Sequence, residues 1–419
     1  MFNKFRPIAS SLSPNLTLRD IFIAGRFLFL PWNWLKWQKG KNTRKLEHKF
    51  NKYLRTRWAV SFASGRAGFY AILKCLDIEE GDEVILPAFT TVALPNAVKW
   101  RGAKPVYVDI EEDTYNINPD LIESKITGKT KMIVAQHTFG NPVRLDKIAE
   151  IAKRHNLYLI EDGAHSLGAE YQNKKVGTFG KAAFFSLGRD KVISSVSGGM
   201  VVTNDQELGR KIKEFRDGLP YPDFLTIKRQ LLHPLITFIA LKTYYFFWIG
   251  KAIMFLFQQT GLLLKAYSKK EKQNEMPENF PARMPDAIAA IALHQFKLID
   301  KFNNHRIKTA RRYQELLSDS QKIIFPQSAA SSKDIFLWYT IQTDNKKELI
   351  KQARKKHILL GDWFPQAVGP AEVDLKKAGY ELGSCPTAEK VCQRCVNLPT
   401  HHGIKEKDIL KVVEVVLAN

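Results

Sequence analysis

Residues 157–205 of the chain read LYLIEDGAHSLGAEYQNKKVGTFGKAAFFSLGRDKVISSVSGGMVVTND. This stretch contains three short apolar runs, at residues 157–160, 182–185 and 200–203. Runs of this length that end in polar residues or follow glycines are typical of strands buried inside a parallel sheet. We therefore expect three strands here, with the polar residues between them in loops at the strand ends.

The residues that follow these runs carry complementary chemistry. Asp162 would keep a pyridine nitrogen protonated, Ser186 would bind a phosphate group, and Lys191 would form a Schiff base with an aldehyde. Together they predict a site for pyridoxal 5'-phosphate. Each residue alone also has an ordinary explanation, because Asp162 could cap a helix and Lys191 could be a solvated surface lysine. The prediction rests on their order and spacing.

Three phrases within the stretch resemble, in order and spacing, the DegT/DnrJ/StrS family of sugar aminotransferases. They are IEDGAHSLGA at 160–169, GTFGKAAFFSLGRDK at 177–191 and SGGMVVTND at 197–205. The resemblance extends from about Trp58 to the C-terminus, apart from one long insert. It implies the fold-type I architecture of pyridoxal-phosphate enzymes, in which a large α/β domain with a mainly parallel sheet is joined to a smaller C-terminal α/β domain.

The resemblance also implies a role for each matching residue. Lys191 would be the Schiff-base lysine, Asp162 the partner of the pyridine nitrogen, and Ser186 a phosphate ligand. His165, at a position where the family commonly has Gln, would neighbour the phenolic oxygen of the cofactor. Dehydratases of the same family carry His at the lysine position, so the presence of Lys191 implies amino transfer.

A strand, a turn of small residues and a helix begin the resembling region. The strand is expected at 58–62 and the helix at 67–76, with Ser64, Gly65 and Arg66 in the turn. Free backbone N–H groups and the helix dipole make such a turn an anion site. The family usually has Ser-Gly-Thr here and binds the cofactor phosphate with it. Arg66 in place of the threonine would either add a bidentate phosphate contact or point to solvent.

A second departure from the family pattern lies after the strand expected at 83–86. The family normally has an aromatic residue where Thr91 stands, stacked on the pyridine ring. A threonine cannot supply the same dispersion and face contact. Either Phe89 or another aromatic residue stacks instead, or the ring is held less tightly.

Strands and helices alternate through much of the chain, which predicts a doubly wound, mainly parallel sheet with its site at the C-terminal ends of the strands. Further strands are expected at 132–135 and 338–342, and further helices at 145–155, 279–300 and 405–417. We divide the chain into an aromatic and basic N-terminal arm (1–50), a large cofactor-binding domain (51–220), an apolar insert (221–275) and a small C-terminal domain (276–419).

The length, net charge and cysteine count of the chain limit its possible environment and partners. A chain of 419 residues is long enough for two domains with sizeable cores. Its formal net charge of +22 favours an anionic partner such as nucleic acid, an acidic membrane surface or a phosphorylated substrate. No DNA- or RNA-binding motif accompanies the charge, so we do not expect nucleic acid. Four cysteines form no disulfide framework in a chain of this size, which predicts a reducing cytoplasm.

Three of the cysteines lie close together near the C-terminus. Cys385, Cys392 and Cys395, with His401 and His402 after them, have the donor types of a Cys3His zinc site. Their C-x6-C-x2-C spacing matches no strong zinc pattern. We interpret the segment instead as a helix with buried cysteines that leads to a Leu-Pro turn, and we expect no metal.

Two segments suggest contact with a membrane. Residues 21–37 are rich in large apolar and aromatic side chains, and residues 36–57 contain nine Lys or Arg against one acidic residue. Residues 231–264 carry full charge only at Lys242 and Lys251. They predict a helical hairpin that dips into one leaflet with its lysines reaching back to the headgroups. The alternative for the arm is that its aromatic residues pack on a dimer partner while its charges stay in solvent. The alternative for the insert is that it buries itself in an enlarged core or a dimer contact.

The sequence therefore predicts a pyridoxal-phosphate aminotransferase. It would move an amino group from an amino acid, for which we expect glutamate, to a keto-sugar linked to a nucleotide or to a lipid. We expect a homodimer at the cytoplasmic face of the membrane. One alternative is a non-catalytic protein that binds membranes or anions on an inherited enzyme fold, and another is an acyl-transferring relative.

Overall fold

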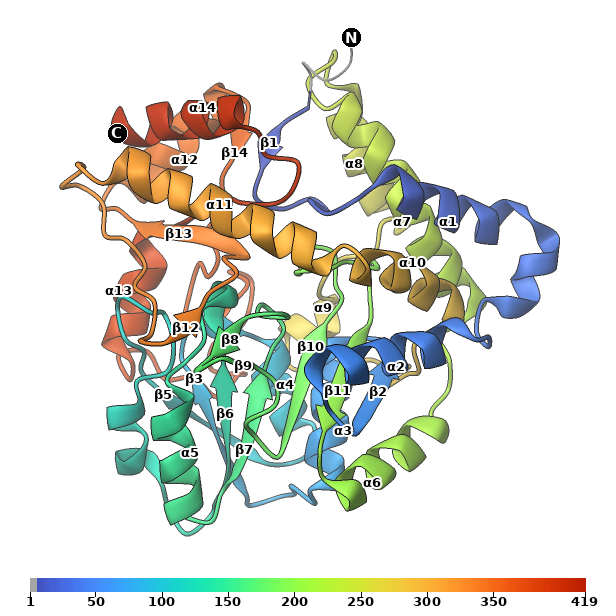
Figure 1. Cartoon of the computed structure of the whole chain (residues 1–419), viewed down its shortest axis with the longest axis vertical. Coiled ribbons are helices and arrows are strands. Elements are labelled where there is room, and N and C mark those ends of the chain that lie inside the picture. The colour runs from blue at the N-terminus through green and yellow to red at the C-terminus, as the bar shows by residue number, and fades with distance from the viewer. Residues whose placement is uncertain (1–5) are drawn as a thin grey trace.

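A computed structural model describes residues 6–419 as an α/β protein built on one large sheet (Figure 1). The order of its seven strands is β2-β11-β10-β7-β6-β3-β5, and β11 runs antiparallel to both of its neighbours. The strands are β2 (Trp58–Phe62), β3 (Glu83–Pro87), β5 (Lys104–Val108), β6 (Thr130–Gln136), β7 (Tyr158–Asp162), β10 (Ala182–Ser186) and β11 (Gly199–Thr203). The predicted doubly wound, mainly parallel sheet is confirmed.

Helices cover both faces of this sheet, so its strands are apolar on both sides. The crossovers through α3 (Gly65–Cys75) and α4 (Ala93–Lys99) run in one direction across the sheet, and the crossover through α5 (Leu145–Arg154) returns. Right-handed crossovers therefore place α5 on the opposite face from α3 and α4 (Figure 1). Helix α6 (Gln206–Asp217) packs beside α3. The strand ends carrying the predicted site meet at one edge.

A second apolar core belongs to the C-terminal part of the chain. Strands β13 (Trp338–Gln342) and β16 (Cys395–Pro399) pair antiparallel, and Tyr313, Leu349 and Val412 from the surrounding helices pack with them. The prediction of a Leu-Pro turn after the cysteines is wrong, because Leu398 and Pro399 belong to strand β16. The helices here are α10 (Asp286–Phe296), α11 (Ile299–Leu317), α12 (Lys346–Lys355), α13 (Pro386–Arg394) and α14 (Glu406–Leu417).

Short strands and 3-10 turns connect these parts. A three-stranded sheet joins β12 (Ser332–Lys333), β8 (Glu170–Tyr171) and β9 (Lys174–Lys175), and β15 (Val368–Gly369) pairs with β4 (Thr90–Thr91). The 3-10 turns of this region are η3 (Pro119–Leu121), η4 (Glu123–Lys125) and η5 (Thr138–Gly140). The β15–β4 pair brings the small domain against the strand that contains Thr91.

The N-terminal arm touches both domains. Strand β1 (Ile8–Ala9) pairs in parallel with β14 (Ile358–Leu359) of the small domain. A capping box between Thr17 and Asp20 then starts α1 (Leu18–Phe29), which is followed by the 3-10 helix η2 (Pro31–Lys36) and by α2 (Asn42–Leu54). Helix α1 packs against α7 (Phe224–Lys242) and α10, and α2 packs against β2.

The insert forms a hairpin of two helices, as its sequence predicted. Helix α7 (Phe224–Lys242) packs on α8 (Ile249–Gln259), and the short helix α9 (Lys269–Lys272) follows. Gly250 permits the close crossing, because a Cβ atom there would collide with the backbone oxygen of Ala240. By length and composition alone, α7 is the one helix among residues 6–419 that could cross a membrane, and 44% of its apolar window is buried within the protein.

Candidate active site

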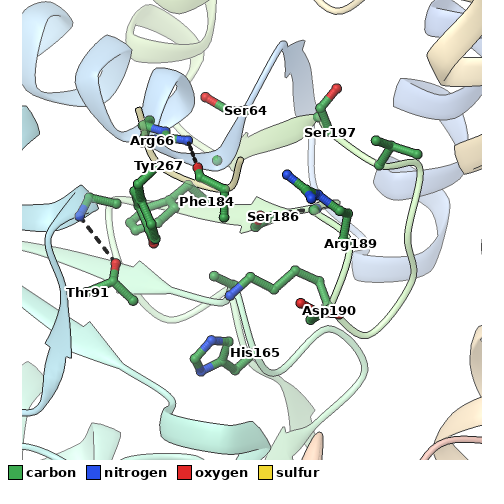
Figure 2. A pocket seen from close by; sticks show the side chains of 18 of the residues that line it. Ser64, Arg66, Thr91, His165, Phe184, Ser186, Arg189, Asp190, Ser197 and Tyr267 are labelled. Carbon is green, nitrogen blue, oxygen red and sulfur yellow. Dashed lines mark hydrogen bonds between the residues drawn. The ribbon is translucent and has the colours of Figure 1, made fainter. Parts of the chain in front are cut away.

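A pocket of about 380 Å³ opens at the C-terminal ends of β7 and β10, beside the start of α3. Its volume lies in the range of small-molecule sites. All eight residues predicted to bind the cofactor line it, and several of them are labelled in Figure 2. They are Ser64, Gly65, Arg66, Thr91, Asp162, His165, Ser186 and Lys191. The sheet therefore brings together residues that lie up to 127 positions apart.

One end of the pocket is an anion cradle. Ser64 caps α3, its Oγ accepting the N–H of Ala67 at 3.2 Å, and the helix dipole points at the same place. Position 65 must be small, because a Cβ atom there would lie 3.0 Å from Cβ of Ser186. Ser186 itself faces the pocket, and its Oγ accepts the N–H of Gly188 at 3.3 Å. Backbone N–H groups and a hydroxyl thus converge as a phosphate group requires.

Asp162 and Lys191 line the same pocket, where the Asp162 side chain is buried and the Lys191 side chain is half-buried. Burial raises the pKa of Asp162 to about 6, although Lys191 and the N–H of Ala164, 2.9 Å from Oδ1, act against the rise. Burial also lowers the pKa of Lys191 to about 8, against the attraction of Asp162 and Asp190. Near neutral pH the lysine therefore holds a substantial fraction of neutral, nucleophilic amine.

His165 is held in a defined orientation. Its ring stacks on Phe139 and Phe364, with centroids 5.8 and 6.3 Å away. The N–H of Phe139 donates to Nδ1 at 3.4 Å, and burial lowers the pKa of His165 well below its usual value. The neutral ring then carries its proton on Nε2, which can donate a hydrogen bond to a phenolic oxygen.

Residues of the N-terminal arm and α11 fix the loop of Lys191, and the sequence did not predict them. Asn15 is fully buried, and its Nδ2 donates to the backbone oxygens of Lys191 and Val192 at 2.6 and 3.1 Å. Arg306 donates to Oδ1 of Asn15 at 2.9 Å and to the oxygen of Val192 at 2.8 Å. No local pattern marks Asn15, which lies outside the resembling region.

The insert supports the same loop through Ser13 of the arm. The N–H of Ser13 donates to Oδ1 of Asp190 at 3.0 Å, and Oγ of Ser13 lies 2.9 Å from Nε2 of His233 in α7. Burial lowers the pKa of His233 well below its usual value, so this ring is neutral. The arm and the insert are therefore parts of the scaffold that positions the lysine.

Arg66 does not point to solvent. It forms an ion pair with Glu271 and donates from Nη2 to the backbone oxygen of Ala266 at 2.9 Å. Thr91 accepts the N–H of Ala93 on its Oγ1 at 3.3 Å. Phe89 is fully buried and is not among the residues that line the pocket, so it does not provide the missing aromatic face.

Two other groups have structural roles. His137 is buried with its Nε2 3.2 Å from Oε2 of Glu161, and Glu161 also accepts the N–H of Gly177 at 2.6 Å. Cys392 and Cys395 are buried in the small domain. Within residues 6–419, no group of three or more His, Cys, Asp or Glu side chains is arranged to hold a metal ion.

The residues of this pocket fit pyridoxal phosphate. They supply an anion cradle at one end, and a buried carboxylate, a partly neutral lysine and a histidine donor line the same pocket. Lys191 would hold the aldehyde carbon, Asp162 the ring nitrogen, and Ser64, Gly65 and Ser186 the phosphate.

Comparison with known proteins agrees with this arrangement. The profile of the DegT/DnrJ/EryC1/StrS aminotransferase family matches residues 30–220 and 250–417. The chain is 29% identical to GDP-perosamine synthase of Escherichia coli O157:H7 over 90% of its own length and 89% of that protein. It is 27% identical to UDP-4-amino-4-deoxy-L-arabinose–oxoglutarate aminotransferase of Shewanella sediminis over 99% and 97%. The crystal structure of Streptomyces venezuelae DesV with a ketimine intermediate superposes with a TM-score of 0.73, at 25% identity, over 95% of this chain and 93% of DesV.

Proposed function

The chain belongs to the DegT/DnrJ/EryC1/StrS aminotransferase family and is a pyridoxal-phosphate-dependent sugar aminotransferase, and we propose that it uses glutamate to aminate a nucleotide-linked keto-sugar at a membrane surface. The observation that carries the chemistry is that Lys191 and Asp162 line one pocket. The family assignment sets aside the alternatives of a non-catalytic binding protein and of an acyltransferase.

The residues of the pocket perform the proton chemistry of amino transfer. Bound among them, pyridoxal phosphate supplies an electron sink for the carbon that exchanges its proton. Nζ of Lys191 accepts a proton from the α-carbon of the amino acid, since its pKa of about 8 makes it an effective base near neutral pH. Asp162 offers a carboxylate to the ring nitrogen and is ionised above its pKa of about 6.

Other lining residues suit a sugar on a phosphorylated carrier. Trp338 and Trp363 present aromatic surface on which the apolar face of a sugar ring can pack. Arg189 and Lys265 line the same pocket and can pair with carrier phosphates. The names of the Escherichia and Shewanella relatives refer to GDP- and UDP-linked sugars, which supports a nucleotide carrier.

Apolar side chains exposed on the arm and the insert support a membrane location. Helices α1 and α7 pack together, so the arm and the hairpin occupy one side of the molecule (Figure 1). Exposed there are Phe22, Phe29, Trp32 and Leu35 of the arm and Phe247, Trp248 and Phe255 of the hairpin, with Leu35 90% and Phe247 81% exposed. Lys251 lies 3.9 Å above the ring centroid of Trp248, and Trp is enriched at membrane–water interfaces.

A basic hollow borders this apolar surface. It lies between α1, α2 and α10, and no acidic residue lines it. Its cationic side chains are those of Arg19, Arg44, Lys45, Lys49, Lys52 and Lys297. Such a cluster beside exposed aromatic residues fits the phosphates of anionic lipids. This surface also supports the second candidate acceptor, a keto-sugar carried on a membrane lipid.

The identity of the acceptor is tested by comparing turnover with the two candidate keto-sugars side by side. Purified enzyme with pyridoxal phosphate and glutamate is offered a nucleotide-linked or a polyprenyl-linked keto-sugar, and formation of 2-oxoglutarate is followed. We expect turnover with the nucleotide-linked sugar. Turnover with the lipid-linked sugar alone would establish the second candidate, and no turnover with either would refute both acceptors.

Sedimentation with vesicles tests the membrane contact. We expect the protein to bind vesicles that contain anionic lipid. Changing both Phe247 and Trp248 to Ser should weaken its affinity for these vesicles roughly fivefold or more. The control is Leu382→Ser, since Leu382 is 72% exposed on the small domain. Equal binding by all three proteins would contradict the proposal. The expected homodimer stays a prediction, which light scattering of the vesicle-free protein would measure.

A further inference from the structure

The part of the insert that follows the helical hairpin lines the cofactor pocket. We call residues 264–274 the strap. Its first part lines the pocket with Leu264, Lys265, Ala266 and Tyr267, close to the anion cradle. The strap thereby adds to the site a set of side chains that the sequence did not predict.

Tyr267 stands where the pocket lacks an aromatic wall. Thr91 lines that side, and in the view of Figure 2 the ring of Tyr267 lies between Arg66 and Thr91. The other large rings of the lining each contact a neighbouring aromatic ring. Phe184 stacks on Phe69 at 5.0 Å, and Trp338 packs edge-on against His165 at 5.8 Å. Trp363 packs edge-on against Phe364 at 5.3 Å.

Arg66 holds Tyr267 in this place. Its guanidinium lies 5.0 Å above the ring centroid of Tyr267 and donates to the backbone of Ala266, the preceding residue. The same guanidinium pairs with Glu271, in which Oε2 also accepts the N–H of Ser268 at 2.7 Å. One arginine at the start of α3 therefore fixes three points of the strap.

Helix α4 fixes the far end of the strap. Nδ2 of Asn96 donates to the backbone oxygen of Glu271 at 2.8 Å, and Nε1 of Trp100 donates to that of Asn274 at 2.9 Å. Asn274 in turn donates from Nδ2 to Oδ1 of Asn96 at 2.6 Å. With both ends anchored, the position of Tyr267 is set by the large domain rather than by the helical hairpin.

We propose that Tyr267 provides the aromatic face for the cofactor ring that Thr91 does not provide, and that Arg66 is the residue that positions it. The departures from the family pattern at positions 66 and 91 then compensate each other through the strap. The inference rests on the cofactor of the family and is independent of the sugar carrier and of the membrane.

Cofactor affinity tests the proposal without reference to turnover. Apoprotein is titrated with pyridoxal phosphate, and the dissociation constant is read from the visible absorbance band of the bound cofactor. Loss of one aromatic face contact predicts roughly tenfold weaker binding for Tyr267→Ala and near-normal binding for Tyr267→Phe. Tyr158→Ala is the matched control, since Tyr158 begins β7 at the strand end opposite Asp162.

Transfer of the aromatic residue provides a gain of function. In the Tyr267→Ala background, Thr91→Phe is expected to restore most of the lost affinity. Should Tyr267→Ala be poorly folded by circular dichroism, Tyr267→Leu replaces it and keeps most of the apolar volume. An affinity of either variant equal to that of Tyr158→Ala would overturn the assignment of Tyr267, and so would a failure of Thr91→Phe to rescue.

Glu271→Gln separates the two possible roles of Arg66. If Arg66 positions the strap, the loss of its ion pair weakens cofactor binding by several-fold. If Arg66 instead binds the cofactor phosphate directly, its release from Glu271 leaves the affinity unchanged or improves it. An unchanged or tighter dissociation constant for Glu271→Gln would therefore overturn the positioning role of Arg66.

Discussion

Replacing Asn15 with Ala tests whether the N-terminal arm positions the catalytic lysine. The change leaves the backbone oxygen of Lys191 without its 2.6 Å donor and removes the 2.9 Å acceptor of the Arg306 guanidinium. The oxygen of Val192 keeps its bond from Arg306 at 2.8 Å. A buried carbonyl without a partner and a lost bond to a charged group together cost about 3 kcal/mol of unfolding free energy. Displacement of the loop is expected to lower kcat on the order of tenfold.

Asn33→Ala is the matched control for this prediction. Asn33 is also a buried asparagine of the arm, and its Nδ2 donates to the backbone oxygen of Arg26 at 3.0 Å, away from the pocket. Urea unfolding should show a loss of about 1 kcal/mol for the control, with kcat unchanged. Both variants are compared at saturating cofactor, so that kcat reports the position of Lys191. Equal kcat values for Asn15→Ala and Asn33→Ala would refute the positioning role.

Three further predictions concern the lysine, the buried aspartate and the hairpin. Lys191→Ala should abolish turnover and the visible absorbance band that wild-type protein shows with pyridoxal phosphate, and retention of both would exclude Lys191 as the cofactor-linked residue. The pKa of Asp162 is about 6 in the folded protein, above its ordinary value of 3.8. The ionised carboxylate therefore destabilises the folded apoprotein, and this cost appears as the pH rises from about 3.8 to about 6 and is absent at lower pH. Asp162→Asn should therefore stabilise the apoprotein at pH 7 relative to pH 4 by about 3 kcal/mol in urea unfolding, and an unaltered pH profile would contradict the burial argument. Gly250→Ala should destabilise the hairpin by about 2 kcal/mol, whereas Gly128→Ala, which meets no atom within 4 Å, should be neutral; equal melting temperatures would show that the crossing is not tight.

Local sequence patterns predicted the sheet well because its strands are buried on both faces. Strands β2 and β13 begin and end at the residues expected, since each is a short apolar run bounded by polar or small residues. The site residues at the ends of β7 and β10 were predictable for the same reason, because neighbouring parallel strands end at one edge. Helix α7 begins earlier than the expected 231, since Asp223 caps it by accepting the N–H of Thr226 at 2.7 Å.

Contacts between distant segments were not predictable from the sequence. Asn15 reaches the lysine loop from 176 positions away, and no periodicity or motif encodes that contact. The strap is equally hidden, because Arg66 and Glu271 are 205 positions apart and either residue alone resembles a solvated charge. Both contacts depend on how the arm and the strap fold back over a sheet that was itself predictable.

The arm joins two distant parts of the protein over a very short length of chain. Ile8 and Ala9 pair with the small domain, and Asn15, only six residues later, holds the lysine loop. A shortened protein that begins at residue 16 would keep every side chain that lines the pocket. It would still have a lower kcat, because the lysine loop would lose its contact with Asn15. Deletion mapping would then assign a catalytic role to the arm, although none of the side chains at residues 6–50 lines the pocket. An affinity tag fused near Asn15 would lower activity in the same way, by displacing the arm from the lysine loop.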